Sequence, residues 1–177
     1  MRHESAVSTV ATSRQPQSAD LPYYVPGVGA WPGHEISILE RGKLVQMWRY
    51  EAQGPSGVVP SMRPVASLCR LPIGCAEAML SALTEDVPPW PRSASDRLRL
   101  FKSLGEMLRN GGPEDVAQVW RSVASQGRHK KLTHLEREMR DRAAAICRSV
   151  LRALPDSPAT RQALEILTDD RKPCPSS

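Results

Sequence analysis

The residues with the clearest capacity for chemistry are the basic side chains of the segment from Arg128 to Leu154. The segment holds eight basic and three acidic residues, and this excess equals the formal net charge of +5 of the whole chain. Guanidinium and ammonium groups neutralise phosphates and other anionic groups. We therefore expect an electrostatic partner to meet this segment through five residues: Arg128, Lys130, Lys131, Arg137 and Arg140.

The charges at the start of this segment also bear on helix energetics. We interpret Gly127 as the end of one helix and predict a single long amphipathic helix from Arg128 to Leu154. The first basic residues would then stand at a helix N-terminus, where positive charge opposes the helix dipole. A chain that accepts such a cost can be using the charges, and phosphate contact is one use. The alternative is a solvated face with local ion pairs, Glu136–Arg140 and Glu138–Arg142.

A helix-turn-helix is a more specific version of the same hypothesis. The predicted helices 114–125 and 132–154 are joined by a short stretch that contains Gly127. The second helix is longer than a typical recognition helix, and its start shows no base-reading pattern beyond Arg128, His129, Lys130 and Lys131.

A second candidate site is aromatic. The segment Leu21–Gly33 contains three prolines and three glycines, which exclude a helix and favour an extended chain. One interpretation is an arm that lies on its own domain. The other is a linear motif that binds a partner. In either case the residues available for packing are Tyr23, Tyr24 and Trp31.

The spacing of cysteine and histidine gives no metal framework. Cys69 and Cys75 are separated by five residues, which is wider than a zinc knuckle, and no second pair completes a site. His129 and His134 are five apart rather than the four that place two imidazoles on one helix face. No nucleophile elbow or phosphate-binding glycine loop is present. We therefore predict no metal, no cofactor and no enzymatic activity.

Composition indicates an ordinary globular chain. Hydrophobic residues make up 40% and charged residues 24% of its 177 residues, which fits one compact domain. No apolar run is long enough to span a membrane, and the first twenty residues lack the apolar region of a secretory signal. Four cysteines are too sparse for a disulfide scaffold, so we expect a reducing, cytoplasmic location.

The elements that must position these residues change character along the chain. Alternating apolar residues in 34–52, interrupted by Arg41-Gly42, predict a β-hairpin. The segment 58–69 contains Pro60 and Pro64, so it can form at most an edge strand. A lone hairpin is only marginally stable and must dock on the helices or on another subunit.

Helical patterns follow from Gly74 onward. We predict helices at 75–85, from an N-cap at Ser95 to Gly111, from Pro113 to Gly127, and from Asp156 to Leu167. The long helix between the last two carries an apolar stripe that consists of Leu132, Leu135, Met139, Ala143, Ile146 and Val150.

The predicted fold is α+β and mostly helical, with a small N-terminal antiparallel β-hairpin followed by a four- to five-helix bundle. Residues 1–33 form a disordered or extended arm, 34–168 one globular domain (34–69 β, 74–168 helical) and 169–177 a flexible tail. We predict a non-enzymatic basic binding protein that contacts an acidic partner, in the first place nucleic acid and otherwise an acidic protein or a membrane surface, through the basic amphipathic helix. One alternative is a self-associating structural or viral matrix-type protein that uses the Pro/Tyr arm and the basic face at a membrane surface. The other is a protein–protein adaptor or inhibitor.

Overall fold

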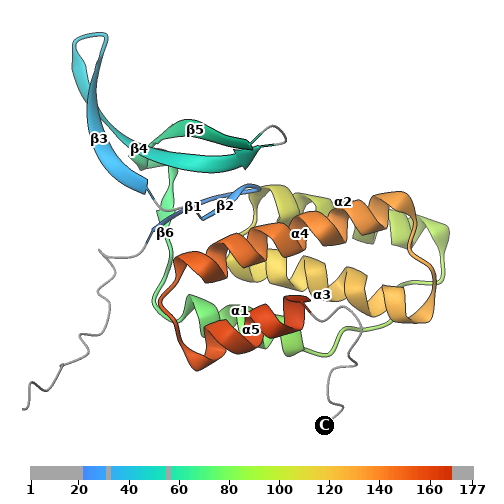
Figure 1. The fold of residues 1–177 in the computed structure, drawn as a ribbon. Coiled ribbons are helices and arrows are strands. Elements are labelled where there is room, and N and C mark those ends of the chain that lie inside the picture. Colours follow the sequence, from blue (N-terminus) through green and yellow to red (C-terminus); the bar gives the residue numbers. More distant parts are fainter. Residues whose placement is uncertain (1–21, 31–32, 55–56, 169–177) are drawn as a thin grey trace, which may run out of the picture.

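The computed structural model describes residues 22–30, 33–54 and 57–168 (Figure 1). In this part of the chain a strand region precedes five helices, which confirms the predicted mostly helical α+β class. The predicted terminal tails and the arm residue Trp31 lie outside the described residues.

The strand region contains two small antiparallel sheets. The outer sheet has the strand order β3-β4-β5, with β3 at Gly33–Glu40, β4 at Lys43–Gly54 and β5 at Gly57–Pro64. A 3₁₀ turn at Val65–Ser67 leads from it to the inner sheet. The inner sheet has the order β2-β1-β6, with β2 at Gly29–Ala30, β1 at Tyr23–Val25 and β6 at Cys69–Arg70. Figure 1 shows the inner sheet between the outer sheet and the helices.

The predicted hairpin is present and is extended by a third strand. Strand β3 pairs with β4 along its whole length, from Gly33 opposite Tyr50 to Glu40 opposite Lys43. Arg41 and Gly42 both have positive φ, 49° and 76°, which suits a two-residue hairpin turn. Strand β5 lies at an edge of the sheet, where the missing N–H groups of its prolines leave the ladder intact.

The five helices surround a shared apolar centre. They are α1 Cys75–Thr84, α2 Ala94–Asn110, α3 Pro113–His129, α4 His134–Ala153 and α5 Pro158–Thr168. Helix α3 contacts α1, α2 and α4, while α5 contacts α1 and α4. Pro113 occupies the first turn of α3, as predicted from its preset φ, and Gly112 N–H donates to Asp115 Oδ2 at 2.8 Å.

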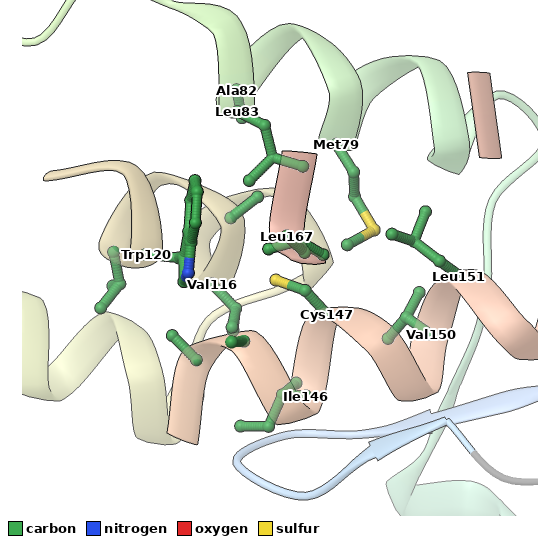
Figure 2. Packing of buried hydrophobic residues seen from close by; sticks show 14 of the residues in the cluster. Met79, Ala82, Leu83, Val116, Trp120, Ile146, Cys147, Val150, Leu151 and Leu167 are labelled. Carbon is green, nitrogen blue, oxygen red and sulfur yellow. The ribbon is translucent and has the colours of Figure 1, made fainter. Parts of the chain in front are cut away.

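Figure 2 shows how this core is filled by side chains from α1, α3, α4 and α5. Trp120 of α3 is the large anchor, and Cys147 of α4 packs as a small apolar residue among its neighbours. Several of these side chains are completely removed from water, among them Met79, Leu83, Val116, Val150, Leu151 and Leu167. A core of this extent holds the helices together without disulfides or metals.

Helix α2 begins two residues earlier than predicted. Its N-cap is Ser93, whose hydroxyl accepts a hydrogen bond from Asp96 N at 3.1 Å, and the predicted cap Ser95 lies in the first turn. Later in α2, Leu104 and Leu108 are buried in the shared core. Leu98 is 56% exposed, and every residue from Ala94 to Arg99 is exposed as well, so the first turns of α2 lie outside that core.

The largest difference from the sequence prediction is the boundary between α3 and α4. Helix α3 continues through Gly127 to His129, and α4 begins only at His134. Gly127 serves as a contact point, since a Cβ there would lie 3.2 Å from Leu132 Cδ1. The N-cap of α4 is Thr133, whose hydroxyl accepts from Glu136 N while the Glu136 carboxylate accepts from Thr133 N.

The chain before the hairpin was expected to hang outside the domain, but residues 22–30 pack on it. Tyr24 is 3% exposed and belongs to the helical core, and its hydroxyl donates to Gly111 O at 3.0 Å. Ala30 N–H donates to Ser149 Oγ at 3.2 Å, and a Cβ at Gly29 would overlap that hydroxyl. Of the two interpretations of this segment, the described part is the arm that lies on its own domain.

Strand alternation places the neighbours of Tyr24 against the outer sheet. Tyr23 and Val25 form a second hydrophobic cluster with Trp48 and Tyr50, and the rings of Tyr23 and Trp48 meet edge to face at 5.0 Å. The guanidinium of Arg70 lies 4.4 Å from the Tyr23 ring centre. Strand β1 therefore joins the two hydrophobic clusters.

We predict that Tyr24→Phe lowers the free energy of unfolding at neutral pH by about 1 kcal/mol, because the partly buried Gly111 carbonyl loses its hydrogen-bond donor. Burial raises the pKa of Tyr24 to about 12 from 10.0. Its contribution is therefore complete below pH 10.0 and is lost as the pH rises toward about 12. Urea unfolding of the wild-type protein and of Tyr24→Phe should show that the difference between their free energies of unfolding decreases over this pH range. A difference that stays constant with pH would contradict the role of the Tyr24 hydroxyl as a buried donor.

Candidate nucleic-acid interface

The five predicted basic residues do not lie on one helix. Arg128 belongs to the last turn of α3, Lys130 is its C-cap and Lys131 lies in the loop that follows. Arg137 and Arg140 belong to the first half of α4. We call the surface formed by these five residues the basic corner, because it lies where α3 ends and α4 begins.

The first charges of the basic corner do not oppose a helix dipole, contrary to the prediction. Arg128 and His129 stand at the C-terminal end of α3, where positive charge is favourable rather than costly. The first turn of α4 instead carries an acid, Glu136, as the dipole prefers. The corner therefore carries its charge without the helix penalty that we predicted.

Lys130 is held by its surroundings. Its ammonium lies 3.1 Å from Glu136 Oε1 and 5.6 Å from the centre of the Trp90 ring, within the range of a cation–π contact. Trp90 is fixed in turn, since its Nε1 donates to Ser122 Oγ at 3.2 Å. Sequence reasoning missed Trp90 because 40 residues separate it from Lys130 and no local pattern connects them.

Glu136 is the one acid in the stretch 128–137, and it is turned inward. Its side chain is 8% exposed, and its carboxylate accepts from Thr133 N at 2.7 Å and from Lys130 Nζ at 3.1 Å. Burial alone would raise the pKa of Glu136, but the hydrogen bonds from Thr133 and Lys130 outweigh it and hold that pKa below its usual value. The negative charge is therefore permanent at neutral pH and hidden from an approaching ligand.

The solvent-facing charge of the corner is positive. Arg128, Lys131 and Arg137 are all exposed. Arg140 follows Arg137 by three residues on the same flank of α4, and it donates two hydrogen bonds to Asp141 Oδ1 at 3.0 and 2.9 Å. Arg140 therefore shares its charge with an exposed carboxylate.

The opposite flank of α4 lines a groove that the sequence did not reveal. Leu135 was predicted in the buried stripe but is 60% exposed, because it lines an open groove rather than the helical core. The groove between the two helices has a volume of about 510 Å³. Its lining mixes apolar and charged residues and includes Phe101, Gly105, Leu108, Glu138, Met139 and Arg142.

The cysteines and histidines of the described residues do not gather into a reactive or metal-binding site. Burial raises the pKa of the Cys75 thiol to about 11 and that of Cys147 to about 12, so both are protonated at neutral pH. Within the described ranges, no group of three or more His, Cys, Asp or Glu side chains could hold a metal ion. The described helices also include none that is long and apolar enough to cross a bilayer.

We predict that Glu136→Gln reduces the pH dependence of stability on the acid side. The lowered pKa means that Glu136 stabilises the fold above pH 4.5 and loses this effect as the pH falls through its lowered pKa. The variant keeps the capping geometry but loses the charge, at a cost of about 1 kcal/mol at neutral pH. Chemical denaturation should show that the difference in free energy of unfolding between the wild-type protein and Glu136→Gln decreases in acid.

The matched control for this prediction is Glu138→Gln, two residues further along α4, whose side chain is exposed. The control should leave stability nearly unchanged at neutral and acid pH. Equal effects of the two substitutions would mean that the buried position of Glu136 is irrelevant.

Comparison with known proteins adds no assignment to this geometry. Neither the models of known protein families nor the curated proteins give a match for the chain.

Proposed function

We propose that this chain is a non-enzymatic nucleic-acid-binding protein that contacts the phosphate backbone through the basic corner. The observation that carries the proposal is the separation of charge at the corner. Three cations, Arg128, Lys131 and Arg137, face solvent, while the acid between them is buried. When such a surface binds a nucleic acid, its cations neutralise phosphates, and the counterions released from the phosphates favour binding.

The frame of the corner supports this role. The loop is short and lies between two helix ends, and the Thr133–Glu136 capping box hydrogen-bonds its last residue, so the backbone that carries Lys131 has few conformations open to it. A fixed surface loses less conformational entropy on binding than a flexible tail. The half-buried Trp90 ring beside Lys130 adds an aromatic surface, a combination that is common where proteins bind nucleic acids.

The alternatives rest on weaker features. An acidic protein or an anionic membrane surface would meet the same cations, so the choice of partner depends on the probe used. Self-association or viral matrix-type assembly through the Pro/Tyr arm loses support, because Tyr23 and Tyr24 are buried in this chain. An adaptor or inhibitor role remains a proposal that depends on surfaces other than the corner.

We predict that Arg128→Glu with Lys131→Glu abolishes measurable binding of a fluorescent DNA duplex at moderate salt. The wild-type protein should lose affinity steeply as salt increases, and replacing each cation separately by Ala should reduce that slope by about one. Fluorescence anisotropy over a salt series measures both quantities.

The matched control is Arg63→Glu with Arg152→Glu, which makes the same change in net charge at exposed positions outside the corner. The control should keep most of the wild-type affinity. Equal losses in the two double variants would show that only net charge matters and would overturn the assignment of the corner. Binding of anionic lipid vesicles in place of DNA would move the function to a membrane surface.

A further inference from the structure

The two edges of the outer sheet differ in how they are protected. At one edge β5 carries Pro60 and Pro64, and proline is a residue that natural sheets use to block pairing with a further strand. At the other edge the eight residues of β3 contain neither proline nor lysine, and they pair one to one with β4 without a bulge. Within the described part of the chain no strand pairs with this second edge, which borders the projecting hairpin in Figure 1. The β3 edge can therefore accept a further strand.

The hairpin turn determines which backbone groups of β3 face outward. The two-residue turn Arg41-Gly42 makes the flanking residues, Glu40 and Lys43, a hydrogen-bonded pair. Hydrogen-bonded and non-hydrogen-bonded pairs alternate along an antiparallel ladder, so the odd-numbered residues of β3 direct their N–H and C=O groups away from β4. No backbone hydrogen bond among the described residues uses these outward groups. Inside the strand they belong to Glu35, Ser37 and Leu39.

A second copy of β3 that runs antiparallel presents the same outward groups. The groups of the two copies meet only when odd-numbered residues stand opposite odd-numbered residues, because only these direct both N–H and C=O toward the partner. With Ser37 opposite Ser37 of the second copy, the pairing covers residues 34–40 of both strands and forms about six main-chain hydrogen bonds. The backbone thus permits a two-fold pairing about Ser37.

The side chains favour this register over the two adjacent ones. Ile36 stands opposite Ile38 of the second copy, and His34 stands opposite Glu40 of the second copy, whose carboxylate can accept a hydrogen bond from the imidazole. With Ile36 on the axis, His34 would face Ile38, and with Ile38 on the axis, Ile36 would face Glu40. Two-fold symmetry repeats each favourable pair, a match that an unrelated extended peptide does not supply.

The same pairing supports the part of the hairpin that β5 does not reach. Strand β5 pairs with β4 only from Met47 onward, so the tip of the hairpin has two strands and is marginally stable alone. A second copy of β3 adds a third strand along this tip. On the face that includes Trp48, the 73% exposed Leu39 would lie beside Glu35 of the second copy and the Arg70 that pairs with it. This contact removes part of an exposed leucine from water.

We propose that the free edge of β3 is a self-association surface, on which β3 of a second copy pairs antiparallel with Ser37 at the two-fold axis. The pairing joins the two three-stranded outer sheets into one continuous sheet. Because the contact consists of one pair of strands and the side chains beside them, it gives a weak dimer that depends on concentration.

The first test is a disulfide bond across the proposed axis. The background is the full chain with Cys69→Ser and Cys174→Ser, because Cys69 is exposed and Cys174 lies outside the described residues. Opposite residues of a hydrogen-bonded antiparallel pair have Cα atoms about 5.5 Å apart, which a disulfide can span. Ser37→Cys should therefore form a covalent dimer under mild oxidation, read by non-reducing electrophoresis and located by peptide mass spectrometry.

The matched control is Gln46→Cys in the same background. Gln46 lies opposite Ser37 on β4 and is also exposed, and either substitution removes the hydrogen bonds between these two side chains. Two copies of Gln46 would be separated by three strand spacings, about 14 Å, which is too far for a disulfide. The control should stay uncrosslinked. Equal crosslinking of the two variants, or none for Ser37→Cys, would overturn the proposal.

The second test is sedimentation velocity of the full chain from about 1 to about 300 µM, a range that brackets weak interfaces. The mass should rise from one chain toward two. Ser37→Pro should weaken the dimer by about tenfold or more, because it removes an outward N–H and leaves the ladder with β4 intact. Ser37→Ala keeps that N–H and should still dimerise.

Three results of this second test would contradict self-association through β3. They are a wild-type protein that stays monomeric over the whole range, a Ser37→Pro dimer as strong as that of Ser37→Ala, and a monomer that pairs this edge with a strand of a different protein.

Discussion

The basic corner depends on the two hydrogen bonds that the carboxylate of Glu136 accepts. One oxygen accepts from Thr133 N and fixes the start of α4, while the other pairs with Lys130. The same contacts bury the only acid of the stretch 128–137, so the charge that these ten residues present to water is positive. Capping, loop geometry and surface charge thus follow from one side chain.

A second constraint joins the two parts of the fold. Strand β1 is three residues long, yet its alternation sends Tyr24 into the helical core and Tyr23 into the cluster beneath the outer sheet. The Tyr24 hydroxyl donates to Gly111 O, and the Tyr23 hydroxyl donates to Glu35 Oε1. The position of the sheet relative to the helices therefore depends on residues that sequence reasoning assigned to an external arm.

Local patterns predicted the elements whose causes are local. The positive-φ turn at Arg41-Gly42 and the start of α3 at Pro113 are set by neighbouring residues, and both are found as predicted. Most of the apolar stripe of α4 is buried, as its helical spacing predicted. The prediction that a helix ends at Gly127 was wrong. Gly127 is instead a contact point for Leu132, and rules for helix ends do not include such a contact. The prediction for Leu135 was wrong because its exposure depends on the groove between α2 and α4, a feature of the tertiary packing that helical periodicity does not contain.

The candidate site was predictable in composition but not in arrangement. The five basic residues could be read from the charge excess, whereas the loop that divides them between two helices could not. Trp90 could not be connected to Lys130, because that contact requires α3 to bring Ser122 within hydrogen-bond distance of the Trp90 indole N–H. Long-range packing therefore determined which cations are exposed and which are held.

The most direct measurement of the central claim is lysine protection by bound DNA, read by amine labelling and mass spectrometry. The basic corner as the binding surface predicts that Lys131 becomes protected when a duplex is added, whereas Lys43 at the hairpin tip and Lys102 on α2 stay reactive. Lys130 is a poor reporter because Glu136 already engages it. Protection of Lys43 or Lys102 with Lys131 still reactive would contradict the account and place the nucleic acid elsewhere.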